Sequence, residues 1–190
     1  MTPGVSTSGP SRFGPLVDSF DIRADALLER FRGRPVVDGV FRTASEIGDF
    51  SAVWHVLNAG RGMIVRRPDQ VVALAVGLGL ESLVVNQGVK RLFRRDRPTV
   101  NGDPRTPVRR PRTSSFPSGH ASAAAFNATV LTGWDRRRAL LWWGVAAVVG
   151  TSRAHVRIHH ASDVVAGAVA GIVMGLAALR LADRIGISRG

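Results

Sequence analysis

Apolar stretches separated by polar, mostly basic connectors make up most of the chain after residue 47. Five such stretches can be distinguished: 50–60, 70–89, 121–134, 139–152 and 164–179. Each is no longer than the roughly 20 residues that span a bilayer as a helix. Helical extension into the flanking residues would supply the missing length. The pattern therefore predicts an all-α bundle with about five apolar helices.

The last stretch, 164–179, distinguishes a membrane bundle from a soluble bundle with buried helices. It is apolar on every face, and Gly or Ala recurs at positions 167, 168, 170, 171, 175, 177 and 178. Small residues allow membrane helices to pack closely. Trp134, Trp142 and Trp143 lie near the ends of apolar stretches, as in an interfacial aromatic belt. These features favour a membrane-embedded bundle.

The N-terminal region differs from this pattern. Residues 1–20 are polar and lack the apolar core of a secretory signal, so we expect a disordered tail. Residues 21–46 are too charged to span a bilayer, but Leu27, Leu28 and Phe31 share one helical face, which favours an amphipathic helix on the membrane surface. A solvated helix fits nearly as well. The membrane core then covers 47–183, and a basic tail covers 184–190.

The charge balance points to anionic partners. The chain has 26 Lys and Arg residues against 14 Asp and Glu, a net charge of +12, and most of the cations are Arg. The guanidinium group matches phosphate oxygens well. Stacking aromatics are not interleaved with the cations, so a nucleic-acid partner is not expected. The chain has no cysteine, which excludes disulfides, zinc–thiolate sites and a cysteine nucleophile.

The connectors are of two kinds. Those at 61–69, at 135–138 and after Arg180 are short and basic, whereas 90–117 and 153–162 are longer and carry His, Ser, Pro and Arg. If each apolar stretch crosses once, the short basic connectors share one side, the cytoplasmic side by the positive-inside rule. The longer connectors, which carry the candidate chemistry, then face outward.

The first candidate cluster is KRLFRRDRP, residues 90–98. Lys90 and Arg97 are seven residues apart, two helical turns, and would point the same way on a helix that Pro98 ends. Two cations directed at one point would bind an anion. A juxtamembrane basic patch that contacts lipid head groups is the alternative.

The second cluster is SSFPSGHASAAA, residues 114–125. Ser118 and Gly119 precede an Ala-rich helix, whose N-terminal N–H groups and dipole can hold an anion. His120 lies in the first turn and could act as a proton donor. A helix cap followed by a surface histidine is the alternative. The preceding Arg109, Arg110 and Arg112 would either extend the anion site or contact head groups.

The third cluster is TSRAHVRIHHASD, residues 151–163. His159 and Asp163 are four residues apart, so on a helix the carboxylate could orient the imidazole and make it more nucleophilic. His160 and His155 are less well spaced for this contact. An alternative is a metal site formed by His155, His159 and Asp163, although the surplus of arginine would repel a cation.

The three clusters together resemble the signature of the type-2 phosphatidic-acid phosphatase family: K-x6-RP at 90–98, PSGH at 117–120 and SR-x5-H-x3-D at 152–163. This superfamily also contains bacterial acid phosphatases and vanadium haloperoxidases, and the resemblance covers roughly residues 45–182. It implies that His159 attacks phosphorus to form a phosphohistidine, that Asp163 orients His159, and that His120 protonates the leaving group. The phosphate-binding residues that it implies are Lys90, Arg97, Ser118, Gly119 and Arg153. It implies no metal or other cofactor.

The resemblance predicts a membrane lipid-phosphate phosphatase, with polyprenyl or glycerolipid phosphates or diphosphates as substrates and the site on the outer face of a bacterial plasma membrane. Larger members commonly have six spanning helices, the first near the N-terminus, where residues 21–46 are too polar here. Two alternatives remain: a non-enzymatic basic scaffold that binds anionic lipid, and a vanadate-dependent haloperoxidase. The oligomeric state stays open.

Overall fold

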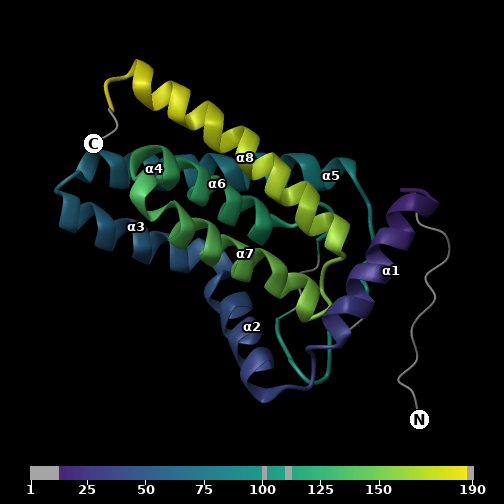
Figure 1. The fold of residues 1–190 in the computed structure, drawn as a ribbon. Coiled ribbons are helices and arrows are strands. Elements are labelled where there is room, and N and C mark those ends of the chain that lie inside the picture. Colours follow the sequence, from purple (N-terminus) through teal and green to yellow (C-terminus); the bar gives the residue numbers. More distant parts are fainter. Residues whose placement is uncertain (1–12, 100–101, 110–112, 188–190) are drawn as a thin grey trace, which may run out of the picture.

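The computed structural model describes residues 13–99, 102–109 and 113–187, and all regular elements in this part are helical, as the sequence predicts (Figure 1). The main helices are α1 (Pro15–Glu29), α2 (Pro35–Ile47), α3 (Ala52–Val65), α4 (Pro68–Ser82), α5 (Lys90–Leu92), α6 (Gly119–Trp134), α7 (Ala139–His155) and α8 (Ala161–Arg184). Short helical links are η1 (Asp49–Ser51), η2 (Leu83–Val89) and η3 (Arg136–Arg138). The five predicted apolar stretches all lie in helices, and α4, η2 and α5 form one continuous helix.

Local sequence signals explain several helix starts. Pro15, Pro35 and Pro68 occupy the first positions of α1, α2 and α4. Proline is favourable there because its φ angle is already helical and its missing N–H would have no helical partner. At the start of α6, the Ser118 hydroxyl accepts a hydrogen bond from the backbone N–H of Ala121 and caps the helix.

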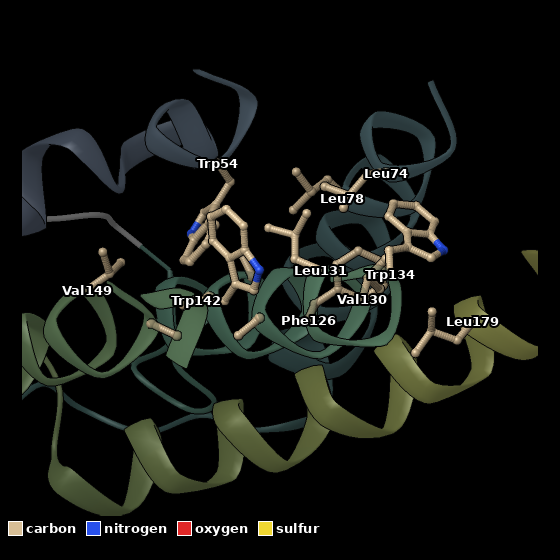
Figure 2. Close-up of a cluster of buried hydrophobic side chains, with 14 of the residues drawn as sticks. Trp54, Leu74, Leu78, Phe126, Val130, Leu131, Trp134, Trp142, Val149 and Leu179 are labelled. Atoms are coloured by element: carbon tan, nitrogen blue, oxygen red, sulfur yellow. The ribbon is translucent and has the colours of Figure 1, made fainter. Parts of the chain in front are cut away.

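Helix α6 forms the centre of the bundle. Twelve of its sixteen residues are buried, and it contacts α4, α7 and α8. Figure 2 shows the apolar core that surrounds it. The largest side chains of this core come from α3, α4, α6, α7 and α8: Trp54, Leu74, Leu78, Phe126, Val130, Leu131, Trp134, Trp142, Val149 and Leu179. Burial of this apolar surface is the main stabilising contribution to the bundle.

Small residues on α8 allow it to pack directly against the backbone of α6. Gly167, Gly171 and Gly175 form a stripe at four-residue spacing. A Cβ atom at Gly171 would overlap the carbonyl oxygen of Ser122, and one at Gly167 would overlap that of Ser118. The Gly and Ala repeat noted in the sequence therefore marks a helix–helix contact, as in membrane bundles.

The outer surface of the bundle is apolar. Within the described ranges, two helices are long and apolar enough to cross a membrane, Pro68–Leu92 with 25 residues and Ala161–Arg184 with 24. In the most apolar 18-residue part of each helix, only 22% is buried inside the protein. The core helix of a soluble protein would be mostly buried. Val165, Val169 and Val173 are exposed along α8. An outer face of this kind is suited to lipid.

The N-terminal region differs from the prediction. Helix α1 begins at Pro15, so the predicted tail to residue 20 is too long, and residues 1–12 lie outside the described part. Residues 21–46 belong to two helices rather than one, because the chain turns at 30–34, where Gly33 has a φ angle of +81°. At the other end, α8 reaches Arg184, and residues 188–190 of the predicted tail are not among those described.

The two ends of the bundle differ in their connectors (Figure 1). The α3–α4 link, the η3 link and the C-terminal end of α8 lie at one end, and these are the short basic connectors. The end of α5, the start of α6, the end of α7 and the start of α8 lie at the other, where α1 and α2 pack against α7 and α1 also against α8. The three sequence clusters therefore meet at the end opposite the basic connectors.

Candidate active site

A cavity of about 1590 Å³ opens at the end where the three clusters meet. Six of the eight predicted site residues line it: Lys90, Arg97, Gly119, His120, Arg153 and His159. The other two, Ser118 and Asp163, are fully buried behind its wall. The structure thus brings together side chains from α5, the segment after it, α6, α7 and the loop before α8.

His159 is held between a cation and a carboxylate. Its Nε2 atom lies 3.1 Å from Nη1 of Arg97, and its Nδ1 atom lies 3.6 Å from Oδ2 of Asp163, slightly beyond hydrogen-bond distance. A guanidinium group can only donate, so Nε2 must be the unprotonated nitrogen and Nδ1 carries the proton. This is the tautomer that a nucleophilic histidine needs.

The environment of His159 also keeps the ring neutral. Burial lowers the pKa of His159 to about 3; the Asp163 carboxylate opposes this shift, and the positive charge of Arg97 adds to it. Near neutral pH the ring therefore holds a lone pair on Nε2 beside the cations of the cavity.

Asp163 is fixed by more than its contact with His159. Its Oδ1 accepts a hydrogen bond from Nη1 of Arg95 at 2.6 Å, and its Oδ2 accepts one from the backbone N–H of His160 at 2.9 Å. Its backbone carbonyl accepts a hydrogen bond from the N–H of Ser118 at 3.0 Å, which joins the start of α6 to the start of α8. The carboxylate orientation is thus determined on several sides.

His120 faces the link between α2 and α3. Its Nε2 atom lies 3.1 Å from Oδ1 of Asp49 and 3.2 Å from the carbonyl oxygen of Ser45. Both partners accept, so this nitrogen carries a proton. Partial burial raises the pKa of Asp49, but the hydrogen bond with His120 and the charge of Arg153 outweigh it, so the net shift is downward and the carboxyl group stays ionised.

Arg153 has donors available for an anion in the cavity. Arg153 is 1% exposed, and its Nη1 atom donates to the hydroxyl and carbonyl oxygens of Ser45. Its Nε and Nη2 atoms are buried with no hydrogen-bond partner among the described residues. Unsatisfied buried donors of a charged group are costly, so this arrangement is suited to a bound anion.

Three details differ from the predicted geometry. Helix α5 ends at Leu92, so Lys90 and Arg97 do not share a helix; Arg97 lies in the segment that follows, where its side chain donates to the carbonyl of Ile158 at 2.7 Å. His159 precedes α8 and reaches Asp163 from the loop rather than from the same helix. The backbone N–H and the hydroxyl of Ser118 both form hydrogen bonds within the protein, and Ser118 does not line the cavity. The next residue, Gly119, does line it.

The other two histidines of the third cluster are held elsewhere. His155 is fully buried, with Nε2 2.7 Å from Oδ1 of Asp38 and its ring stacked on Phe41 at 4.4 Å. His160 faces the carbonyl of Asp96 at 3.2 Å. Neither lines the cavity. Within the described ranges, no three His, Asp or Glu side chains are grouped to hold a metal ion, so the alternative of a metal face has no structural counterpart.

The sequence interpretation missed two contacts of the site, Asp49 against His120 and Arg95 against Asp163. Asp49 is an isolated carboxylate between two helices, and Arg95 is one of several arginines in its cluster, so neither has a spacing that singles it out. Arg109 is exposed and does not line the cavity, and Arg110 and Arg112 lie outside the described residues.

Comparison with known proteins agrees with this geometry. The model of the PAP2 superfamily matches residues 70–186, more than half of the chain. The chain belongs to the PAP2 superfamily. No curated protein matches this PAP2 sequence significantly.

Two solved structures resemble the PAP2 chain over most of its length. One is described as the first transmembrane PAP2 type phosphatidylglycerolphosphate phosphatase from Bacillus subtilis, with 22% identity, a TM-score of 0.69, and coverage of 90% of this chain and 88% of that one. The other is LpxE from Aquifex aeolicus, with 25% identity, a TM-score of 0.68, and coverage of 84% and 94%. Together with the apolar outer surface, the superfamily match and these two structures show that the chain has the membrane-embedded helical fold of the PAP2 superfamily.

Proposed function

We propose that this protein hydrolyses a phosphomonoester or diphosphate of a membrane lipid through a phosphohistidine on His159. The observation that carries the proposal is the position of His159: its unprotonated Nε2 faces the cavity cations, and its Nδ1 faces a buried carboxylate. A nucleophile and the charges that would neutralise phosphate oxygens thus share one cavity.

In the first step, the Nε2 lone pair of His159 attacks phosphorus, and the bond from phosphorus to the lipid oxygen breaks. Lys90, Arg97 and Arg153, with the amide of Gly119, bind the phosphoryl oxygens and stabilise the charge that they carry in the transition state. These groups do the electrostatic work that a metal does in many phosphatases. His120 gives its proton to the departing lipid alkoxide.

In the second step, water attacks the phosphorus of the phosphohistidine. His120, now neutral, accepts a proton from that water, and the phosphorus–nitrogen bond breaks to release inorganic phosphate and restore His159. Asp163 stabilises the positive charge that His159 carries while it is phosphorylated. The same residues thus serve both steps with atoms and protons balanced.

The surroundings of the cavity favour a lipid substrate. The cavity exceeds the volume of a phosphate group, so it has room for a head group. Phe50 and Phe93, both exposed, lie on its wall, and the bundle beyond has an apolar outer surface where lipid tails can remain in the bilayer. Polyprenyl and glycerolipid phosphates both have this combination, and the solved relative from Bacillus subtilis is described as acting on phosphatidylglycerolphosphate. The basic connectors at the opposite end support a site on the outer face of the plasma membrane.

The proposal is tested with the purified full-length protein in detergent, assayed for release of inorganic phosphate from a panel of polyprenyl and glycerolipid phosphates and diphosphates. Release that is lost in the His159→Gln variant, together with an acid-labile phosphoryl label on the wild-type protein, is the expected result. No release from any lipid of the panel would favour the lipid-binding scaffold. Vanadate-dependent halide oxidation without phosphate release would favour the haloperoxidase.

A further inference from the structure

Asp21 of α1 is a buried carboxylate that points toward the candidate active site from outside the matched family region. It is 8% exposed, and residues 70–186 are those that match the superfamily model. Helix α1 packs against α7 and α8. A surface anchor needs no buried carboxylate on the side that faces the protein, so the contacts of Asp21 call for another explanation.

Asp21 and Asp163 are joined through one guanidinium group. Nη2 of Arg95 donates to Oδ2 of Asp21 at 2.7 Å, and Nη1 of Arg95 donates to Oδ1 of Asp163 at 2.6 Å. All three side chains are largely buried, and that of Asp163 is fully buried. Arg95 is thus shared between the N-terminal helix and the carboxylate that faces His159.

Ser162, the residue before Asp163, strengthens this connection. Its backbone N–H donates to Oδ1 of Asp21 and its hydroxyl to Oδ2 of Asp21, both at 2.8 Å. The hydroxyl also accepts a hydrogen bond from Nη1 of Arg95 at 2.7 Å. Asp21 therefore holds both the first turn of α8, which carries Asp163, and the cation that contacts Asp163.

The charges explain why Asp21 matters for orientation. Asp163 uses Oδ1 for Arg95 and Oδ2 for His159 and His160. Without Asp21, Arg95 would keep a single buried carboxylate partner and would be free to change its angle on Asp163. Because Oδ2 is already 3.6 Å from Nδ1 of His159, a further shift would break that contact.

We propose that Asp21 and Arg95 are positioning residues that hold the Asp163 carboxylate in the orientation in which it faces His159. The N-terminal helix α1 thus contributes to the active site. This inference rests on the proposed function, since it assigns a role in the same reaction. Neither residue contacts the phosphoryl group in this assignment; both act through Asp163.

Asp25 offers a matched control on the same helix. It lies one turn after Asp21, and it pairs with Arg32 at 2.7 Å and with Arg157 at 3.0 Å. Its side chain pairs with these arginines rather than with Asp163 or Arg95. Loss of Asp25 therefore weakens the docking of α1 without touching the orientation of Asp163.

The test is a double-mutant cycle in the full-length protein, with the lipid phosphate that the wild type hydrolyses best. We expect Asp21→Asn and Arg95→Lys each to lower kcat by about 10- to 100-fold, because small displacements of a reacting group cost that much. The KM of Asp21→Asn should stay nearly unchanged, because Asp21 does not line the cavity in which phosphate would bind. Asp25→Asn should remain close to wild type. Thermal unfolding of each variant checks that the fold is retained, and Asn keeps the shape of Asp.

The decisive comparison is with Asp163→Asn. If Asp21 acts through Asp163, the variant Asp21→Asn/Asp163→Asn should be no slower than Asp163→Asn alone, because the effects of coupled residues are not additive. Additive losses, an unchanged kcat in Asp21→Asn, or equal losses in Asp21→Asn and Asp25→Asn would each overturn the inference. A wild-type protein that hydrolyses no lipid phosphate would instead overturn the proposed function.

Discussion

Oδ1 of Asp49 lies 3.1 Å from Nε2 of His120, so the second histidine of the cavity, like His159, faces a carboxylate. The two pairs differ in their surroundings: Asp163 is fully buried, whereas the Asp49 side chain is 33% exposed. A carboxylate beside a histidine stabilises the imidazolium form and fixes the ring. Burial lowers the pKa of His120, and Asp49 opposes this shift, so Asp49 is placed to favour the protonated form that a proton donor needs.

Replacement of Asp49 should therefore affect proton donation more than phosphate binding. We expect Asp49→Asn to lower kcat about tenfold or more for alkyl phosphates, whose leaving group needs a proton, and much less for p-nitrophenyl phosphate, whose leaving group does not. Parallel kinetics with the two substrates measure this. Glu46→Gln is a suitable control, because Glu46 forms an exposed ion pair with Arg42 close by. Equal losses for both substrates would argue against the assignment.

The three histidines of the 151–163 stretch should separate clearly on substitution. His159→Gln should abolish turnover and phosphoryl labelling, because no other side chain would supply the covalent step. His160→Ala should keep most activity, since His160 faces the Asp96 carbonyl rather than the cavity. His155→Ala should lower the melting temperature, because it removes the histidine that contacts Oδ1 of Asp38, but should keep the turnover of the folded protein. Residual labelling in His159→Gln would require a different nucleophile.

The sequence predicted residues that the structure brings together, but not the way in which they are brought together. The sequence motifs, with the family resemblance that they carry, predicted Lys90, Arg97, Gly119, His120, Arg153 and His159 as site residues, and all six line the cavity. The spacing argument relied on shared helix faces, and here it was wrong: Arg97 follows the helix that carries Lys90, and His159 precedes α8. Tertiary contacts, not helical periodicity, bring these side chains together.

The N-terminal contribution could not be predicted for a physical reason. Residues 21–46 were interpreted from their charge and amphipathicity, which describe how a segment meets solvent or lipid. Asp21 contacts Arg95, which lies 74 residues further along the chain. Asp49 contacts His120, which is similarly distant in sequence. No periodicity connects residues so far apart, whereas the Gly stripe of α8 is local and was recognised.

The protonation of His159 can be tested directly. Burial, together with the charge of Arg97, lowers the pKa of His159 to about 3, although Asp163 opposes the shift. The ring should therefore stay neutral at pH 5, where an ordinary histidine is charged. Nitrogen-15 NMR of the histidine-labelled protein, with His159→Gln to assign the signal, measures this. An imidazolium signal from His159 at pH 5 would contradict the prediction.

The same shift has a consequence for stability. The unfolded chain binds a proton at this histidine below about pH 6.5, whereas the native protein does so only near pH 3. The unfolded state thus binds more protons in this window, and the free energy of unfolding contributed by His159 falls as the pH falls from about 6.5 to 3. The melting temperature of His159→Gln should depend less on pH over this range than that of the wild type. An identical dependence would show that His159 is protonated in the native state.

The contact between α6 and α8 should be intolerant of a single methyl group. An Ala in place of Gly171 would gain roughly 1 kcal/mol of helix propensity. Its Cβ would overlap the carbonyl oxygen of Ser122, however, and backbone cannot move aside as a flexible side chain can. Overpacking of this kind costs about 1–3 kcal/mol, so we expect a net loss of stability.

Gly144 provides the control for Gly171, because a Cβ there meets no atom within 4 Å. Gly144→Ala in α7 should leave the melting temperature unchanged or raise it, whereas Gly171→Ala should lower it; thermal unfolding in detergent measures both. Gly171→Ala should also lower kcat, since separation of α6 and α8 would stretch the hydrogen bond from Ser118 N–H to the Asp163 carbonyl. A stable, fully active Gly171→Ala protein would mean that the two helices can move apart without cost, and that their close packing does not hold the site together.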